Sequence, residues 1–143
     1  IFQIALGGLT AGLKAGFMYN TYPKMGDDWL PESAWMMPSL GMNFLENGVM
    51  VQFMHRWMAL LVLITIFTLW FRARKMSLAP WPRTGIYFSV TAAVVQFSLG
   101  ILALLYHMPV ILGVLHQSGA FLLFSALLFT LYQTQRNEKQ KSL

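Results

Sequence analysis

The sequence predicts an all-α membrane protein, a four-helix transmembrane bundle whose first helix is truncated. Of its 143 residues, 57% are hydrophobic and only 10% are charged, and the mean hydropathy is +0.55. Soluble domains carry roughly 25% charged residues, so the composition excludes that class. Three apolar runs, at residues 49–71, 84–106 and 110–133, reach the roughly 20 residues that cross the hydrocarbon core of a bilayer.

Charge and cysteine content exclude several classes of function. The net charge is +5, and the basic residues lie at the ends of the apolar runs, which is typical of membrane topology. The chain has no cysteine, which excludes disulfides, thiolate metal sites and a cysteine nucleophile. We therefore expect the lipid bilayer as a partner and no nucleic acid.

Residues 1–13 form an apolar stretch that is too short to span a bilayer. Glycines recur every four positions, at Gly8, Gly12 and Gly16, and this spacing puts them on one face of a helix. Such a face lets a neighbouring membrane helix pack closely. We interpret the stretch as a partial transmembrane helix whose glycines serve packing, and we expect the chain to be a piece of a longer protein.

Residues 14–48 form a long connection of mixed composition. It contains prolines, tryptophans and the acidic residues Asp27, Asp28, Glu32 and Glu46. Loops longer than about 15 residues are usually either functional or disordered, and tryptophan favours the interface between lipid and water. We expect short interfacial segments that make an ordered cap over one face of the bundle.

The basic segments predict how the chain crosses the membrane. Residues 72–83, which follow the span at 49–71, are basic, and so is the tail at 134–143, which follows the last span. Basic segments favour the cytoplasmic side, and the alternation of three spans places both of them on that side. We expect the C-terminus in the cytoplasm or matrix and the long loop outside, in a bacterial plasma membrane or a mitochondrial inner membrane.

Two histidines lie at matching depths in two of the spans. His55 belongs to the polar sequence Gln-Phe-Met-His-Arg at 52–56, and both His55 and His116 lie six residues after the start of their spans. At about 1.5 Å per residue, each lies about 9 Å below the outer boundary. Ionisable residues inside a membrane mark functional sites, and imidazole is a common axial ligand of heme iron. We predict that the two histidines face each other and bind one heme iron.

Each histidine alone has a simpler interpretation, because an intramembrane histidine can also form a hydrogen bond between helices. The equal depths favour ligation. Small residues at helical spacing also leave room for a flat macrocycle beside the pair, at Ala59, Gly113, Gly119 and Ala120. The span at 84–106 has an inward-facing side of small and polar residues, at Ser89, Ala92, Ala93, Gln96, Gly100 and Ala103.

Three more residues are candidates for cofactor binding. Arg56 points away from the first histidine around the helix, and it is either a partner for heme propionates or an anchor at lipid headgroups. Gln52, one turn before that histidine, and Gln117, beside the second one, either orient the ligands or join helices. His107 lies in an outer turn, and we expect it to be a water-exposed residue instead of a ligand.

These features make the sequence resemble the heme A synthase family, membrane enzymes that make the heme of cytochrome oxidases. The resemblance covers nearly the whole chain. It rests on motifs in the family's order: residues 11–16 (Ala-Gly-Leu-Lys-Ala-Gly), 19–26 (Tyr-Asn-Thr-Tyr-Pro-Lys-Met-Gly), 29–31 (Trp-Leu-Pro), 46–47 (Glu-Asn), 52–56 and 116–119 (His-Gln-Ser-Gly).

The resemblance implies an architecture and a cofactor. Family members have two four-helix halves related by an internal repeat, and this chain looks like the C-terminal half of such an eight-helix protein. The resemblance implies that His55 and His116 ligate a heme b. That heme would relay electrons while the other half oxidises a methyl group of heme O to a formyl group.

The resemblance also implies what this chain lacks. In the other half a glutamate one turn before the His-Arg pair is proposed to act in catalysis, and the corresponding residue here is Gln52. We therefore expect no catalytic residue in this chain, which would be an oxidoreductase only as part of the full-length protein. Some members carry a cysteine pair in an outer loop, which this chain lacks.

The expected partners are heme O in the other half, heme O synthase, an electron donor and a further copy of the protein in a homo-oligomer. Two alternatives stay open. One is a cytochrome b-like electron carrier without catalysis of its own. The other is a structural or transport domain whose histidines pack or relay protons.

Overall fold

The computed structural model describes the backbone of residues 1–141 and the side chains of residues 1–137, so positions 142 and 143 of the predicted tail lie outside the described residues. Within that part the chain is helical and contains no strand. Three helices are long and apolar enough to cross a membrane: α3 (Gly48–Ala73), α4 (Pro80–Leu105) and α5 (Val110–Lys141). The predicted class, an all-α membrane protein, is confirmed.

Four short helices precede these spans: α1 (Phe2–Gly12), η1 (Ala15–Phe17), η2 (Glu32–Trp35) and α2 (Leu40–Leu45). Two buried asparagines organise the connection that contains η2 and α2. Asn43 pairs with the backbone of Met37 in both directions, at 2.9 and 3.1 Å, and Asn47 Nδ2 donates to the Ser33 carbonyl at 2.7 Å. The connection is therefore held by side chains that satisfy its own backbone groups.

The ends of the long helices follow from local chemistry. The Asn47 side chain caps α3 by accepting from the Val49 amide at 2.9 Å. α4 begins at Pro80 and not at the predicted position 84, because a first-turn amide has no helical partner and proline loses nothing there. α5 continues past the predicted position 133 to Lys141, since its polar tail consists largely of good helix formers.

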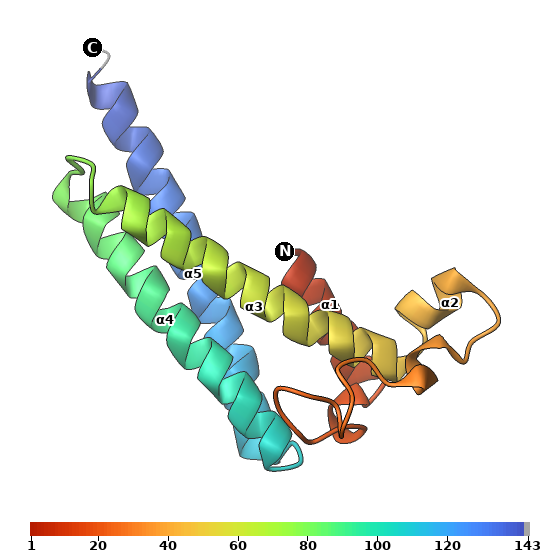
Figure 1. Cartoon of the computed structure of the whole chain (residues 1–143). Helices are drawn as coiled ribbons and strands as arrows, with labels where there is room; N and C mark the ends of the chain where they lie inside the picture. Colours follow the sequence, from red (N-terminus) through yellow and green to blue (C-terminus); the bar gives the residue numbers. More distant parts are fainter. Residues whose placement is uncertain (142–143) are drawn as a thin grey trace.

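Packing between helices uses small residues. α4 and α5 form an antiparallel hairpin, α3 packs against α4, and α1 packs against α3 (Figure 1). A Cβ atom at Gly85 of α4 would lie 2.5 Å from the Thr130 hydroxyl of α5, so the glycine permits this close approach. The inward-facing side predicted for residues 84–106 is confirmed at Ser89, Ala93 and Ala103, which are buried.

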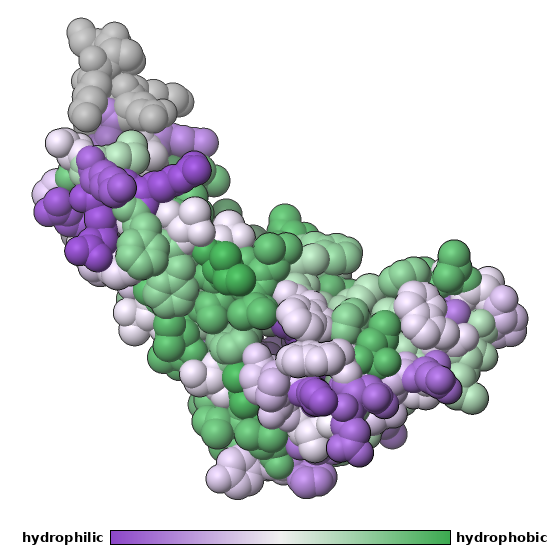
Figure 2. All heavy atoms as spheres, in the orientation of Figure 1, coloured by the Kyte–Doolittle hydropathy of each residue, from purple (hydrophilic) through white to green (hydrophobic). Residues whose placement is uncertain are grey.

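The surface has an apolar middle between two hydrophilic ends. Figure 2 shows hydrophilic residues where α3 meets α4 and again over the long connection, with hydrophobic residues between them. Large apolar side chains of α5 are exposed, among them Ile111 at 75% and Phe121 at 69%. A soluble protein rarely exposes so large an apolar area, whereas an integral membrane protein covers it with lipid.

Candidate functional site

The structure brings the two predicted ligands together. His55 of α3 and His116 of α5 have ring centroids 6.4 Å apart, and the ring planes are inclined by 80°. Two imidazole nitrogens bound at about 2 Å to one metal ion, with each ring centre roughly 1 Å behind its nitrogen, would place the ring centres about 6 Å apart. The spacing of the two ring centres is therefore compatible with a shared metal ion.

A glutamine from the preceding helix holds His55. Gln3 Nε2 of α1 lies 3.1 Å from His55 Nδ1 and donates to the His55 carbonyl oxygen at 3.1 Å. One turn further along α1, a Cβ atom at Gly7 would lie 3.4 Å from His55 Cε1. Gly7 therefore lies beside the imidazole, and a methyl group there would make an ordinary van der Waals contact with the ring.

His116 is held in the same way by α4. Gln96 Nε2 lies 3.1 Å from His116 Nδ1 and donates to the His116 carbonyl oxygen at 2.8 Å. A Cβ atom at Gly100 would lie 2.8 Å from His116 Cε1, and one at Gly119 would collide with Gln96 Oε1. Both glycines therefore make room for the histidine–glutamine pair. The sequence predicts that Gly119 leaves room for a macrocycle, and in the structure it leaves room for the Gln96 side chain.

Sequence reasoning missed both of these glutamines as partners of the ligands. The helical spacing predicts only that Gln96 faces inward, and it assigns no role to Gln3. The signal that could have found them is a repeat, Gln-x-x-Leu-Gly, at residues 3–7 and 96–100. Each copy lies on the helix that precedes a histidine-bearing helix, α1 before α3 and α4 before α5.

The glutamine oxygens bear on whether the site suits a bound metal. Gln3 Oε1 and Gln96 Oε1 are buried and have no hydrogen-bond partner. A neutral imidazole that binds a metal through one nitrogen carries a proton on the other, which needs an acceptor. An amide can turn its oxygen to the position of its nitrogen, and each glutamine would then accept from the ring nitrogen but give up the hydrogen bond that it donates to the histidine carbonyl oxygen. The residues present therefore fit a pair of metal-ligating histidines.

The number of ligands favours a heme over a bare ion. Among the side chains that the structure describes, no three from His, Cys, Asp and Glu gather as a metal site. A structural metal ion usually takes four protein ligands, and a catalytic one takes three. Two histidines match an iron whose remaining positions belong to a macrocycle.

Arg56 and Gln52 both reach the long connection. Arg56 Nη1 donates to the Thr21 and Lys24 carbonyls at 2.8 and 3.2 Å, and Arg56 Nη2 donates to the Tyr19 carbonyl at 2.6 Å. Gln52 Nε2 donates to the same Tyr19 carbonyl at 3.0 Å. Neither interpretation of Arg56 included these partners, which fix residues 19–24 against α3.

The other candidates lie away from the pair. Gln117 is exposed on α5, and His107 is exposed in the turn between α4 and α5, where its φ of 59° is left-handed. A Cβ atom at Gly113 would meet nothing within 4 Å, so the face of α5 one turn before His116 is open. The described site thus consists of two imidazoles, two glutamines and the glycines that accommodate them.

Comparisons with known proteins identify the family of the chain. The family model described as cytochrome oxidase assembly protein, COX15-CtaA, matches residues 1–128. The chain is 40% identical to heme A synthase COX15 of Arabidopsis thaliana over 130 residues, and these residues are 91% of this chain and 28% of that protein. It is 38% identical over 138 residues to the heme A synthase of Flavobacterium johnsoniae, covering 95% of this chain and 40% of that protein.

A third relative is heme A synthase COX15 of Bos taurus, 36% identical over 140 residues, which are 97% of this chain and 34% of that protein. The chain thus spans about a third of the length of the curated relatives it matches. No solved structure matches it.

Proposed function

The chain belongs to the COX15-CtaA family of cytochrome oxidase assembly proteins, and from that premise we propose that it is the heme-holding part of a heme A synthase. In this proposal His55 and His116 are the axial ligands of a heme b. When bound, that group supplies one-electron redox chemistry. The remainder of the full-length protein would oxidise a heme O methyl group to a formyl group, and this chain would relay electrons.

The residues of this chain would bind and orient the cofactor. Gln3 and Gln96 would hold the nitrogens that face away from the iron, and the resulting hydrogen bonds would fix how each ring is turned. Arg56 and Gln52 would keep the long connection over the outer end of α3. Since the basic ends favour the cytoplasm or matrix, the histidine pair would lie nearer the opposite face of the membrane.

The observation that carries the proposal is the 6.4 Å spacing of the two imidazoles. The test is the absorption spectrum and heme content of the full-length protein from heme-replete cells. His55→Ala or His116→Ala should remove one heme per chain or convert it from low-spin to high-spin. His107→Ala removes the exposed histidine and should change neither. An unchanged spectrum in both ligand variants would exclude the assignment.

A second candidate is an electron carrier of the cytochrome b kind, without catalysis of its own. It shares one observation with the first candidate, which also expects no catalytic residue in this chain: every acidic side chain that the structure describes lies in the connection at 14–48. A site without a carboxylate lacks a common general acid or base. Conversion of heme O by the full-length protein would exclude this candidate, and absence of conversion with a normal heme spectrum would support it.

A further inference from the structure

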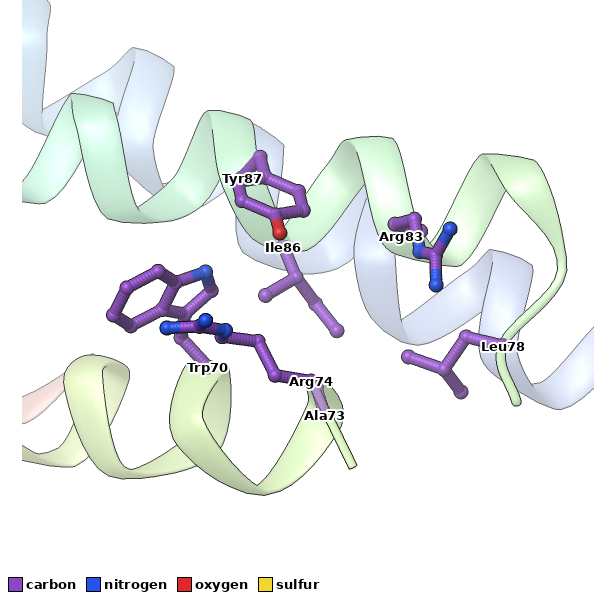
Figure 3. Close-up of a pocket in the computed structure, with 7 residues that line it drawn as sticks. All are labelled: Trp70, Ala73, Arg74, Leu78, Arg83, Ile86 and Tyr87. Atoms are coloured by element: carbon purple, nitrogen blue, oxygen red, sulfur yellow. The ribbon is translucent and has the colours of Figure 1, made fainter. Parts of the chain in front are cut away.

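A cavity of about 100 Å³ opens at the end of the bundle where α3 meets α4 (Figure 3). It lies between the last turns of α3 and the first turns of α4, so it is at the basic end and far along α3 from His55. Its wall includes two arginines, two aromatic residues and two aliphatic residues: Trp70, Arg74, Leu78, Arg83, Ile86 and Tyr87. Nothing in the proposed redox role uses these side chains.

The positive charge of this cavity is not balanced by any acidic residue near it in the sequence. Arg74 and Arg83 both line the cavity, and the chain has no acidic residue between Glu46 and Glu138. The Arg74 guanidinium carbon lies 4.9 Å from the centre of the Trp70 ring, which holds the planar group by a cation–π contact. A stacked guanidinium keeps its N–H groups free for an anion, and its fork matches the oxygens of a phosphate.

The same cavity contains a hydrogen-bond donor without an acceptor. Trp70 Nε1 is buried and has no partner, and leaving a buried donor unpaired is unfavourable. In Figure 3 this nitrogen and the Tyr87 hydroxyl both lie between α3 and α4. The Trp70 and Tyr87 rings are in edge contact, with centroids 6.3 Å apart. An acceptor-rich anion at this nitrogen would also lie beside the Arg74 guanidinium that stacks on the Trp70 ring, and Arg83 adds positive charge to the wall of the same cavity.

We propose that this cavity binds the phosphate group of an anionic membrane lipid. The cavity lies at the end of membrane-spanning helices, where lipid headgroups are found, and basic pockets between such helices bind anionic headgroups. Leu78 and Ile86 provide an apolar wall beside the arginines, which suits the start of an acyl chain. A free phosphate ion shares the polar chemistry but cannot use that wall.

The experiment measures lipid binding to the full-length protein in detergent by native mass spectrometry, with phosphatidylglycerol and with phosphatidylcholine. Phosphatidylglycerol should bind in preference to phosphatidylcholine. The double variant Arg74→Gln/Arg83→Gln should bind it about tenfold more weakly than the double variant Arg72→Gln/Lys75→Gln. The second variant is the matched control, because it removes the same charge from the same end of the bundle, at exposed side chains that do not line the cavity.

Equal loss in the two double variants would show diffuse attraction to a basic loop and would overturn the proposal, as would equal binding of the two lipids. Trp70→Phe provides a test that leaves the charge intact, because it keeps an aromatic ring beside Arg74 and removes the N–H group. It should weaken phosphatidylglycerol binding severalfold. Unchanged binding in this variant would contradict the part assigned to the indole nitrogen.

Inorganic phosphate distinguishes the two sources of the anion. It is added at constant ionic strength, with chloride as the reference. If phosphate displaces bound phosphatidylglycerol, the cavity recognises the phosphate group itself. If the lipid stays bound, the cavity recognises the headgroup together with its apolar neighbour. Binding of neither phosphate nor phosphatidylglycerol would overturn the proposal.

Discussion

Each imidazole of the histidine pair has its Nδ1 nitrogen against a glutamine amide, at 3.1 Å in both cases. At His116 this contact leaves the other ring nitrogen, Nε2, for a metal, whereas at His55 the Gln3 amide nitrogen also lies 3.5 Å from Nε2. Both glutamine oxygens are buried and unpaired, so the polar capacity of the two amides is only partly used by the protein alone. At this scale the site consists of two equivalent contacts, and each can be tested by changing one side chain.

Substitutions at Gln96 should shift the midpoint potential of the heme in this site in a defined order. Gln96→Glu places a carboxylate at the Nδ1 proton, raises the basicity of the ligand and should lower the potential. Gln96→Leu removes the acceptor and should raise it. For the transfer of one electron, a shift of about 60 mV in the midpoint potential corresponds to a tenfold change in the equilibrium constant of reduction. Redox titration of the full-length protein measures the order, and the same substitutions at the exposed Gln117 are the control. Any other order would disprove this role of Gln96.

The glycines beside the rings should tolerate alanine to different degrees. A methyl group at Gly100 would lie 2.8 Å from His116 Cε1, and one at Gly7 would lie 3.4 Å from His55 Cε1. Gly100→Ala should therefore reduce heme occupancy strongly, because the His116 ring must move. Gly7→Ala should change it little, because a methyl group at 3.4 Å makes an ordinary van der Waals contact with the His55 ring. Gly8→Ala on the same helix meets nothing within 4 Å and is the control. Heme per chain is the measurement, and full occupancy in Gly100→Ala would contradict the packing described.

At the scale of helices and loops, the N-terminal half of α3 organises the long connection. Arg56 and Gln52 converge on the Tyr19 carbonyl, and Asn20 Nδ2 donates to the Leu104 carbonyl of α4 at 2.8 Å. Residues 19–24 are thus joined to two different spans. A loop held at both sides is expected to be less mobile than its length suggests.

Removing the Arg56 guanidinium should loosen this loop. Arg56→Ala removes three hydrogen bonds to the Thr21, Lys24 and Tyr19 carbonyls, and bonds from a charged donor contribute about 1.5 kcal/mol or more each. Amide exchange in residues 19–24 should therefore become at least about tenfold faster. Hydrogen–deuterium exchange of the full-length protein tests this, with Arg72→Ala, an exposed arginine near the other end of α3, as the control. Unchanged exchange would show that other contacts hold the loop.

Sequence periodicity predicts the helices and the relative position of residues along them well, and it predicts the neighbours of a residue poorly. The spans and the meeting of His55 with His116 could be predicted because hydropathy and the 1.5 Å rise act along one helix. The contact with Gln3 could not be predicted in that way, because it depends on which helix packs beside α3. The partners of Arg56 were missed for a related reason, since backbone carbonyls of an irregular loop leave no pattern in the sequence. Pro80 was assigned to a loop because proline breaks helices except in their first turn.

At the scale of the whole molecule, two helix pairs meet at the histidines. α1 and α3 carry Gln3 and His55, and α4 and α5 carry Gln96 and His116. Each pair holds its own imidazole, so the angle between the rings follows from how the pairs are oriented. That angle is 80°. The electronic structure of a shared iron would therefore report the packing of the whole bundle.

Nearly perpendicular imidazole planes should give the oxidised heme of this site a highly anisotropic low-spin signal in electron paramagnetic resonance. Parallel planes would give a rhombic signal instead, because the two ligands would then interact with the same iron d orbital. Low-temperature spectra of the full-length protein test this expectation, with His116→Ala to identify the signal of this site. A rhombic signal that this variant removes would show that the pairs rotate relative to each other when heme binds.

The two helix pairs differ mainly in how their members are joined, by residues 13–47 in one and by residues 106–109 in the other. Both arrangements nevertheless present glutamine, glycine and histidine alike. A short-turn hairpin such as α4–α5 is then a sufficient building block, and two of them facing each other could serve as a template for a minimal synthetic cytochrome. Such a synthetic protein could omit the long connection at residues 13–47.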